Sequence, residues 1–547
     1  MVILKIARIG CLLIFLALLL MATFPLVSGV PVEFFLRLDP LIFAVTLLGS
    51  WAWIPALLPA VGILLLTLIL GRFFCSAVCP MGATIDLVDS ALSRCSGRPV
   101  KMDRSRHEAL IRVKYVILIF LLGAALGGLS LIQFFSPMAL ITRFYGMLVL
   151  PVVTVIGEMV LGILRPAARL VGLSALEYAV LDAPRFALQW LTVMIFAGVF
   201  ACAFFAPRFW CRYLCPAGAI FAVCSRRPVL RRSVNENCIR CGLCQEGCPM
   251  DAIGEDPFDT VHSECIGCRT CVRVCPENAV SFTGRRPVQG KEGNSVSAGR
   301  RGFICAAITG VFAGLITKTG IGFRSGGPVE GELLNPGMIR PPGALPEKEF
   351  LLRCVRCGEC MKACPTNTLQ PAWFEAGLEG MVSPVIRPRR GPCEPGCAVC
   401  GQVCPTGAIR ALSLEEKTCA KVGTAYVIRH KCLAWEFDQA CLICDEVCPY
   451  GAIGLKTVPE IQVAVPFVDE KKCNGCGFCE YYCPVQAGSA IVVEPMDEIR
   501  LESGSYCDRA RELGFSFREK QPLEHVPGQQ GPDAGESRRV LPPGFTE

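Results

Sequence analysis

The sequence predicts a multidomain protein in which an N-terminal α-helical transmembrane bundle precedes small α+β domains built around clustered cysteines. Hydrophobic residues make up 52% of the 547 residues, and the mean hydropathy of +0.47 is too high for a soluble protein of this length. The 35 cysteines mostly recur two or three residues apart. Neighbours so close are poorly placed to bridge each other, which makes a disulfide framework a weak interpretation.

The first domain, residues 1–230, contains apolar runs that are each long enough for a membrane-spanning helix. They predict four transmembrane helices, at 9–29, 43–70, 114–135 and 186–206. No signal-peptide cleavage site follows the first run, so we expect an uncleaved anchor. A further apolar segment, 146–164, carries Pro151 and Glu158 and suits a buried or interfacial helix at least as well as a span.

Basic residues set the expected topology. Seven Lys or Arg lie from Arg72 to Arg112, and six lie from Arg208 to Arg232 with no acidic residue among them. Such loops face the cytoplasm. An even number of crossings must then separate them, which makes 136–184 one external excursion. The net charge of +7 is modest, and its concentration in these loops indicates membrane topology rather than nucleic acid as a partner.

Two short stretches of this domain match each other, RFFCSAVCPMGA at 72–83 and RFWCRYLCPAGA at 208–219. Each follows a predicted span at its cytoplasmic end, and cysteines four residues apart share one face of a helix. The candidate thiols of a shared redox or metal site are therefore Cys75, Cys79, Cys211 and Cys215. The alternative is that each Cys-Pro pair merely ends a helix and the thiols pack as small apolar groups.

Residues 238–276 carry two copies of the run CxxCxxCxxxCP. Three thiolates two residues apart wrap one corner of an iron–sulfur cube, and the cysteine before proline ligates the neighbouring cube. Zinc modules use well-separated pairs and often histidine, whereas only four histidines occur here, and no CxxCH is present for c-type haem. The pattern resembles a bacterial two-cluster ferredoxin and predicts such a domain at 231–285. One [4Fe–4S] cluster would be held by Cys238, Cys241, Cys244 and Cys275, and the other by Cys265, Cys268, Cys271 and Cys248.

A polar linker follows within 286–345, and inside it Arg300 and Arg301 precede about eighteen mostly apolar residues, a length that can span a bilayer. The pattern resembles a twin-arginine export signal, here internal. Whether the segment is a fifth span or such a signal, the arginines stay inside and the following domain lies outside. An amphipathic segment resting on the membrane is the alternative. Charge bias favours the periplasmic or extracytoplasmic side for the C-terminal domain.

Four more cysteine groups fill residues 346–507 and predict a domain with four [4Fe–4S] clusters. The groups are Cys354, Cys357, Cys360 and Cys364; Cys393, Cys397, Cys400 and Cys404; Cys432, Cys441, Cys444 and Cys448; and Cys473, Cys476, Cys479 and Cys483. The fourth cysteine of a group can complete an adjacent group or a nested one (first with fourth, second with third), and both pairings stay open. Cys419 fits no group, Cys507 is expected to pack or lie at the surface, and 508–547 is expected to be a disordered polar tail.

The membrane half resembles a known family. Four spans, two C-x3-CP motifs, an appended two-cluster ferredoxin and the stretch FSPMALITRF at 135–144 resemble the NapH-type membrane quinol-dehydrogenase component over residues 1–285. NosR-like and CcoG-like membrane ferredoxins share the C-x3-CP pattern. The passage IRPPGALPEKEFLLRCVRCGEC at 339–360 resembles the MauM/NapG-type ferredoxins, over about 300–500. The chain thus looks like a NapH-like protein fused to a NapG-like one.

These resemblances imply a multi-pass protein of the bacterial cytoplasmic membrane, embedded in lipid, with the domain at 231–285 in the cytoplasm. No P-loop, dinucleotide fingerprint or nucleophile elbow occurs in the sequence, so six clusters in series predict electron conduction. The resemblance implies a subunit associated with quinol dehydrogenase activity, which relays electrons between the quinone pool and a terminal reductase or cytochrome partner. A cytoplasmic donor would reverse the flow. The alternatives are a copper reductase of the CcoG-like type, acting through the C-x3-CP thiols, and a maturation factor with structural clusters.

Overall fold

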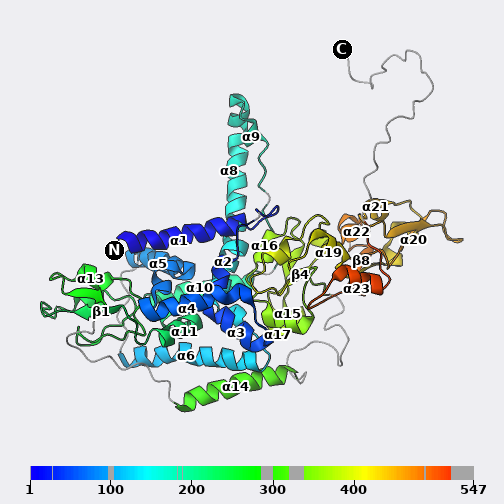
Figure 1. Cartoon of the computed structure of the whole chain (residues 1–547). Helices are drawn as coiled ribbons and strands as arrows, with labels where there is room; N and C mark the ends of the chain where they lie inside the picture. The colour runs from blue at the N-terminus through cyan, green and yellow to red at the C-terminus, as the bar shows by residue number, and fades with distance from the viewer. Residues whose placement is uncertain are drawn as a thin grey trace.

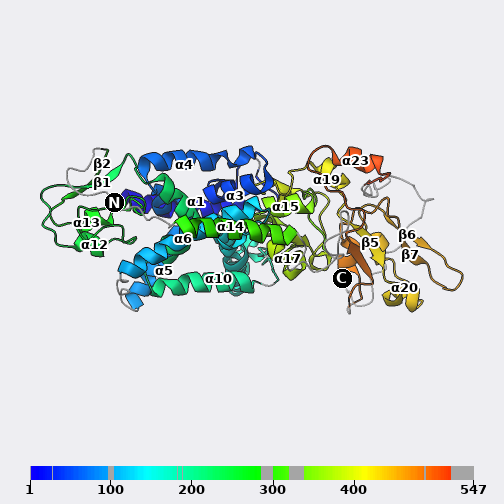
Figure 2. The ribbon, with the colours of Figure 1, turned by 90° about the horizontal axis from the view of Figure 1, so that it is seen from below.

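A helical body lies between two cysteine-rich domains, one at each end of the molecule (Figure 1, Figure 2). The structure is a computed structural model that describes residues 2–27, 29–95, 104–181, 183–187, 189–284, 300–318, 338–485 and 488–518. The first cysteine-rich domain lies at the end of the body where the chain begins, and the C-terminal domain lies at the opposite end (Figure 1).

Apolar helices run along the long axis of the body (Figure 2). They are α1 (Val2–Met21), α4 (Leu58–Leu70), α6 (Arg104–Leu126), α10 (Trp190–Ala201) and α14 (Arg300–Lys318). The other helices around them are α2 (Phe34–Arg37), α3 (Pro40–Ser50), α5 (Pro80–Cys95), α7 (Pro137–Arg143), α9 (Ser174–Glu177) and α11 (Pro216–Cys224). Among the described residues, three helical runs are long and apolar enough to cross a membrane: Leu4–Met21, Ser105–Leu126 and Pro137–Leu170.

The apolar run predicted as one span at 43–70 forms two helices. Helix α3 ends at Trp51, whose φ of 50° is left-handed. The chain re-enters a helix at Pro55, in a short 3-10 turn that leads into α4. A left-handed residue stops one helix, and proline favours the first position of the next, so the interruption is local and the apolar character continues through it.

The other predicted spans are shifted along the chain. Helix α1 ends at Met21, short of the predicted 29, because Pro25 follows closely and cannot continue a helix. Helix α6 begins ten residues before the predicted 114, because its basic first turns are helical, and it ends before two glycines of which Gly128 has a φ of 86°. Helix α10 covers only the middle of the predicted 186–206.

Helix α14 packs along α6 with the two backbones in near contact. A Cβ placed on Gly123 of α6 would lie 2.6 Å from the carbonyl oxygen of Ala307 in α14, closer than any side chain can approach. The four glycines of this contact are Gly123, Gly127, Gly310 and Gly314. Glycine pairs four residues apart let membrane helices approach in this way. The apolar segment after Arg300 is therefore a helix of the body, and it runs parallel to α6.

Helix α8 (Leu150–Val171) leaves the body at a steep angle to the other long helices, with α9 at its tip (Figure 1). It continues α7 through a π-helical turn, η4 (Phe144–Val149). Apolar side chains such as Met159 and Ile163 are exposed along it, and only 6% of its apolar stretch is buried within the chain. The segment predicted at 146–164 is therefore mostly exposed rather than buried, although the chain after α9 returns alongside it and Leu181 N donates to the Glu158 carboxylate.

The first cysteine-rich domain is closed by one antiparallel pair, β1 (Arg231–Val234) with β2 (Val280–Thr283). Between these strands lie α12 (Leu243–Glu246) and α13 (Thr270–Val274), one inside each cysteine group. The pairing brings the two ends of the domain together, so both cysteine groups project from one compact loop region.

The C-terminal domain consists of three two-stranded antiparallel sheets and short helices. The pairs are β3 (Leu369–Pro371) with β4 (Pro384–Ile386), β5 (Thr424–Val427) with β8 (Ile491–Glu494), and β6 (Ile453–Lys456) with β7 (Val465–Val468). The helices are α15 (Glu347–Arg353), α16 (Glu359–Ala363), α17 (Gly377–Gly380), α18 (Val399–Gln402), α19 (Leu414–Cys419), α20 (Leu433–Glu436), α21 (Ile443–Glu446), α22 (Phe478–Tyr482) and α23 (Tyr506–Glu512).

Both ends of this domain extend beyond the predicted limits of 346 and 507. Residues 338–345, predicted as linker, are buried, and Ile339 bridges to Ile386 of β4. At the other end, α23 crosses the predicted start of the tail at 508, because Tyr506 and Ala510 pack inside the domain. The rest of the predicted tail, beyond 518, lies outside the described residues.

The C-terminal domain packs directly on the helical body. Val355 and Cys357 belong to the same apolar cluster as Leu41 of α3 and Leu140 of α7. Lys362 of α16 donates from Nζ to the carbonyl oxygens of Leu19, Leu20 and Ala22 at the end of α1. A cation at the C-terminal end of a helix satisfies its last carbonyls and complements its dipole.

Candidate iron–sulfur centres

In the four CxxCxxC groups, the backbone turns sharply around the middle cysteine. The residues on either side of it all have left-handed φ values, namely Arg240 and Gly242, Gly267 and Arg269, Arg356 and Gly358, and Gly475 and Gly477. Such turns point successive N–H groups into one concavity, which suits anions and thiolate-ligated clusters. Three of these residues are arginines in a conformation that costs free energy for a non-glycine residue, so the local fold is one that the site requires.

The cysteine before proline receives a backbone hydrogen bond at its sulfur. The N–H of Ala252 donates to Cys248 Sγ (3.4 Å), that of Ala279 to Cys275 Sγ (3.3 Å) and that of Ala452 to Cys448 Sγ (3.3 Å). The donor is four residues after the cysteine in each case, which explains the recurrent alanine of the string C-P-x-x-A. An N–H donor to sulfur stabilises the thiolate form that binds iron.

The first domain brings together the two predicted sets of four cysteines. One cavity is lined by Cys238, Cys241, Cys244 and Cys275, and a second by Cys248, Cys265, Cys268 and Cys271. Arg232 of β1 lines both cavities, and its Nη2 donates to Cys244 Sγ (3.5 Å). A buried cation between two groups of thiolates offsets their negative charge.

In the C-terminal domain, the fourth cysteine of each group lies with the adjacent group. One cavity is lined by Cys432, Cys441, Cys444 and Cys483, and another by Cys448, Cys473, Cys476 and Cys479. Electrostatic interactions join Cys404 to Cys354, Cys357 and Cys360, and join Cys364 to Cys393, Cys397 and Cys400. Of the two pairings that the sequence leaves open, the structure has the adjacent one.

Burial of these cysteines favours their neutral form. It raises the pKa of Cys265 to about 12, that of Cys271 to about 11 and that of Cys444 to about 12. Iron binds thiolates, so loading of the sites must release these protons, and the metal must supply the positive charge that the apolar surroundings lack. Four sulfur donors around one cavity, with N–H donors and a buried cation, fit a [4Fe–4S] cluster.

The four cysteines of the two C-x3-CP stretches converge. Every pair among Cys75, Cys79, Cys211 and Cys215 interacts electrostatically. Each stretch forms a π-helical turn, η2 (Phe74–Val78) or η6 (Trp210–Leu214), and the second cysteine of each leads into α5 or α11 with extended backbone. The spacing predicts that the two thiols of a stretch share one face of an α-helix. In the structure they are instead brought together by the two matching π-helical turns.

The arginine that opens each stretch reaches the opposite one. Nη1 of Arg208 donates to the carbonyl oxygen of Cys75 (3.3 Å), and a Cβ on Gly218 would lie 3.0 Å from Nη2 of Arg72. Cys75 also packs with Cys248, Cys265 and Cys268 around one apolar cluster. The converging thiols therefore lie directly beside the second centre of the first domain.

Within the part of the chain that the structure describes, no three His, Cys, Asp or Glu side chains are close enough together to hold one metal ion. Ligands of a cubic cluster are bound through different iron atoms and stand farther apart than the ligands of one tetrahedral ion.

Known protein families match the cysteine-bearing segments. A 4Fe-4S binding domain family matches residues 52–99 and 188–235, which contain the C-x3-CP stretches. Two 4Fe-4S dicluster domain families match the rest, one at 237–280 and one at 353–408 and 439–487.

The most informative relatives are curated ferredoxin-type proteins. The chain is 37% identical over 191 residues to the methylamine utilization ferredoxin-type protein MauM of Methylorubrum extorquens, which is 34% of this chain and 78% of that protein. It is 35% identical over 222 residues to MauM of Paracoccus denitrificans, or 40% of this chain and 92% of that protein. It is 34% identical over 177 residues to the ferredoxin-type protein NapG of Escherichia coli, which is 31% of this chain and 75% of that protein.

The chain belongs to the MauM/NapG family of ferredoxin-type proteins. The resemblance predicted from residues 339–360 is confirmed, and this ferredoxin-type protein is an iron–sulfur electron-transfer protein. No solved structure matches it.

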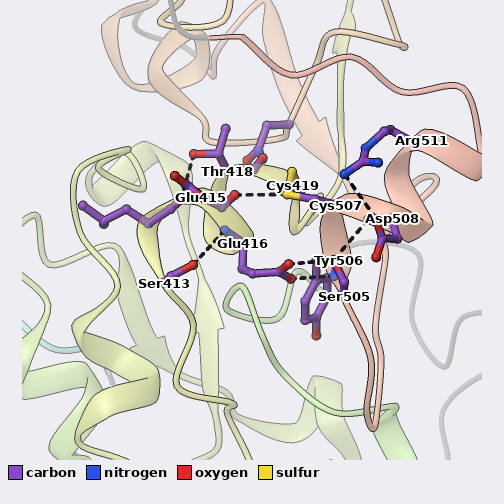
Figure 3. The surroundings of a disulfide bond; sticks show 12 residues. Ser413, Glu415, Glu416, Thr418, Cys419, Ser505, Tyr506, Cys507, Asp508 and Arg511 are labelled. Carbon is purple, nitrogen blue, oxygen red and sulfur yellow. Dashed lines mark hydrogen bonds and ion pairs between the residues drawn. A yellow bond between two sulfur atoms is a disulfide. The ribbon is translucent and has the colours of Figure 1, made fainter.

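The ferredoxin-type protein also contains a disulfide that the sequence analysis misses, Cys419–Cys507 (Figure 3). It joins the end of α19 to α23, and beside it the Glu416 carboxylate accepts hydrogen bonds from Ser505 Oγ (2.7 Å) and Tyr506 N (2.6 Å). The expectation that Cys507 is unpaired is therefore wrong. A signal for the bond was present, because these are the two cysteines of residues 346–547 that no cluster group contains.

Proposed function

We propose that the chain is a NapH–NapG-like fusion, a multi-pass membrane protein that passes electrons between a membrane quinone and a redox partner. The observation that carries the proposal is the position of the C-x3-CP thiols, inside the helical body and directly beside a cluster site. Cysteine-rich domains at both ends of that body then form one conducting route. The first domain faces the cytoplasm, and the C-terminal domain and its terminal reductase or cytochrome partner lie on the other side.

The proposal assigns six [4Fe–4S] clusters, and each supplies the exchange of one electron. Two are held in the first domain by the two sets of four cysteines that line its cavities. Four are held in the C-terminal domain by adjacent groups, Cys354, Cys357, Cys360 and Cys404; Cys364, Cys393, Cys397 and Cys400; Cys432, Cys441, Cys444 and Cys483; and Cys448, Cys473, Cys476 and Cys479. The protein fixes the thiolates, donates N–H bonds to them and shields them from water.

The arrangement of helices supports the membrane topology. Helices α1, α4, α6 and α10 supply four crossings and α14 a fifth, and α14 begins with Arg300 and Arg301. Because α14 runs parallel to α6, it ends at Lys318 towards the side of the body where the C-terminal domain lies. Helix α8, steeply inclined to this axis and apolar, suits the lipid–water interface.

The disulfide supports an extracytoplasmic C-terminal domain, since such bonds persist in oxidising compartments. Replacing Cys419 by serine frees Cys507, and we expect a membrane-impermeant maleimide to label Cys507 from outside intact spheroplasts. The wild-type protein, with both sulfurs bonded, serves as the unlabelled control. Labelling of the variant only after the membrane is permeabilised would place the domain in the cytoplasm.

Quinol oxidation is tested directly by adding a reduced menaquinone analogue to the membrane-embedded protein without oxygen and following cluster reduction by EPR. We expect reduction in the wild-type protein. Replacing Cys211 by alanine should abolish or greatly slow this reduction while the six clusters remain, because it removes a thiol beside the second centre. Cys202, a cysteine outside the motif, provides the matched alanine control.

Two outcomes would contradict the proposal. If quinol reduces no cluster but a low-potential soluble ferredoxin does so rapidly, electrons enter from the cytoplasm instead. If copper(II) is bound and reduced in a manner that depends on the C-x3-CP thiols while quinol is inert, the protein is a metal reductase.

A further inference from the structure

Arg143, at the end of α7, is a fully buried cation with almost no partners. Its exposed fraction is 0%, and its Nη2 donates to the carbonyl oxygen of Gln133 (3.2 Å). Nε and Nη1 have no hydrogen-bond partner, and no carboxylate in the described part of the chain forms an ion pair with it. A guanidinium buried without an anion is costly, so these two nitrogens indicate that a negatively charged group belongs beside them.

The ionisable group that interacts electrostatically with Arg143 is the thiol of Cys357. Cys357 and Val355 belong to the apolar cluster that also contains Leu140 and Ile141, the residues just before Arg143 in α7. Arg143 comes from the helical body, whereas Cys357 comes from the C-terminal domain. The guanidinium therefore lies at the interface of the two parts, next to one predicted cluster site.

The same interface is fixed by contacts on both sides of Arg143. Gln133 Nε2 donates to the carbonyl oxygen of Leu378 in the C-terminal domain (3.4 Å). A Cβ on Gly358, beside Cys357, would lie 2.5 Å from the sulfur of Met147 in η4, which shows how closely this turn approaches the body. The guanidinium is thus held in place relative to the cysteine group, as an electrostatic role requires.

Other cluster sites have a buried cation from their own domain, and so does this one, since the buried Arg356 interacts electrostatically with Cys354. Arg232 donates to Cys244, and Lys417 interacts electrostatically with Cys393, Cys397 and Cys400. Lys417 has its own carbonyl partners, Glu394 and Pro395. Arg143 differs in both respects, because it crosses a domain interface and keeps two donors free.

We infer that Arg143 is a positioning residue for the cluster held by Cys354, Cys357, Cys360 and Cys404, and that its charge raises the reduction potential of that cluster. The inference rests on the proposed function. Four thiolates would give a bound cluster a net negative charge, and its one-electron reduction would increase that charge. A fixed cation in a low-dielectric interface stabilises the reduced form more than the oxidised one and so raises the reduction potential.

The test is a redox titration of the full-length protein, monitored by EPR, for the wild type and Arg143→Gln. We expect the potential of one cluster to fall by at least a tenfold change in its reduction equilibrium, about 59 mV for one electron, while the other clusters keep theirs. Thr142→Val is the matched control, because Thr142 is the buried neighbour of Arg143 on α7 and carries no charge. The cluster potentials of this variant should equal those of the wild type. A purely structural role would alter cluster content without this selective shift.

Each other outcome has a defined meaning. An unchanged set of potentials in an Arg143→Gln protein that keeps all its iron overturns the inference. If that variant loses the cluster, Arg143→Lys decides, because lysine keeps the charge but not the planar donors, and we expect it to keep the cluster with a potential close to that of the wild type. Loss of the cluster in Arg143→Lys as well, or a tenfold fall in its reduction equilibrium there, overturns the inference. If Cys357→Ala leaves every [4Fe–4S] signal in place, it is the proposed cluster assignment that fails.

Discussion

Replacing Glu264 by alanine is expected to detach the first cysteine-rich domain from the helical body, at a cost of about 3–5 kcal/mol. Glu264 directly precedes Cys265 and is 2% exposed. Its carboxylate accepts hydrogen bonds from Arg72 Nη1 (2.9 Å), Lys114 Nζ (2.5 Å) and Tyr115 Oη (3.0 Å), which all belong to the body. The substitution leaves two buried cations without a counter-charge, which is far more destabilising than loss of an exposed ion pair.

The measurement is thermal loss of the cluster absorption of the purified protein, compared with quinol-driven cluster reduction. Glu264→Ala should unfold the first domain at a markedly lower temperature and interrupt electron transfer beside the C-x3-CP thiols. Glu277→Gln, at an exposed position of the same domain, is the matched control and should behave like the wild type. Equal stability of the two variants would show that the domain is held by its apolar contacts alone.

The same network predicts a pH dependence. Burial opposes ionisation of Glu264, but Lys114 and Arg72 outweigh it and lower the pKa of Glu264 below its ordinary 4.5. A group whose pKa is lower in the folded state contributes stability that is complete above its unfolded pKa. The contribution of Glu264 is therefore full above about pH 4.5 and is lost as the pH falls through the folded value.

Most of the features that could be predicted from the sequence follow from the spacing of its cysteines. The CxxCxxC pattern determines both a local turn and a chemistry, so the cysteine-bearing segments and the ferredoxin-type family follow from the residues themselves. The helical body follows from apolar composition in the same way. The ends of its helices could not be predicted from composition, because single residues such as Trp51 and Pro25 stop a helix within a sequence that stays apolar on both sides.

Contacts between distant parts of the chain gave no sequence signal. Glu264 and Arg143 look like ordinary charged residues in the sequence, and only the fold buries them at the boundaries between the helical body and a cysteine-rich domain. The Cys419–Cys507 bond is the exception, because these are the two cysteines of residues 346–547 that lie outside every cluster group. The pairing of the cysteine groups could not be predicted from the sequence either, because the spacing of the cysteines is compatible with both the adjacent and the nested arrangement.

That pairing leads to the second large effect, in double substitutions of the C-terminal domain. If Cys364 completes the site of Cys393, Cys397 and Cys400, then Cys364→Ala and Cys397→Ala remove ligands of one cluster, and the double variant should lose one [4Fe–4S] cluster. Combining Cys364→Ala with Cys404→Ala should instead remove two, because Cys404 lies with the group of Cys354. Alanine is preferred to serine since it has no oxygen that can replace the thiolate.

Mössbauer spectroscopy of iron-57-labelled protein counts the clusters that survive in each variant. Under the nested pairing, Cys364 would serve the fourth group and Cys397 the second, so the first double variant would lose two clusters rather than one. The comparison does not depend on whether a damaged site keeps part of its iron, because only intact [4Fe–4S] spectra are counted. The adjacent pairing agrees with the geometry of α16, which carries Cys360 and leads to Cys364, so that one short helix connects the first two cysteine sites at the side of the domain nearest the helical body.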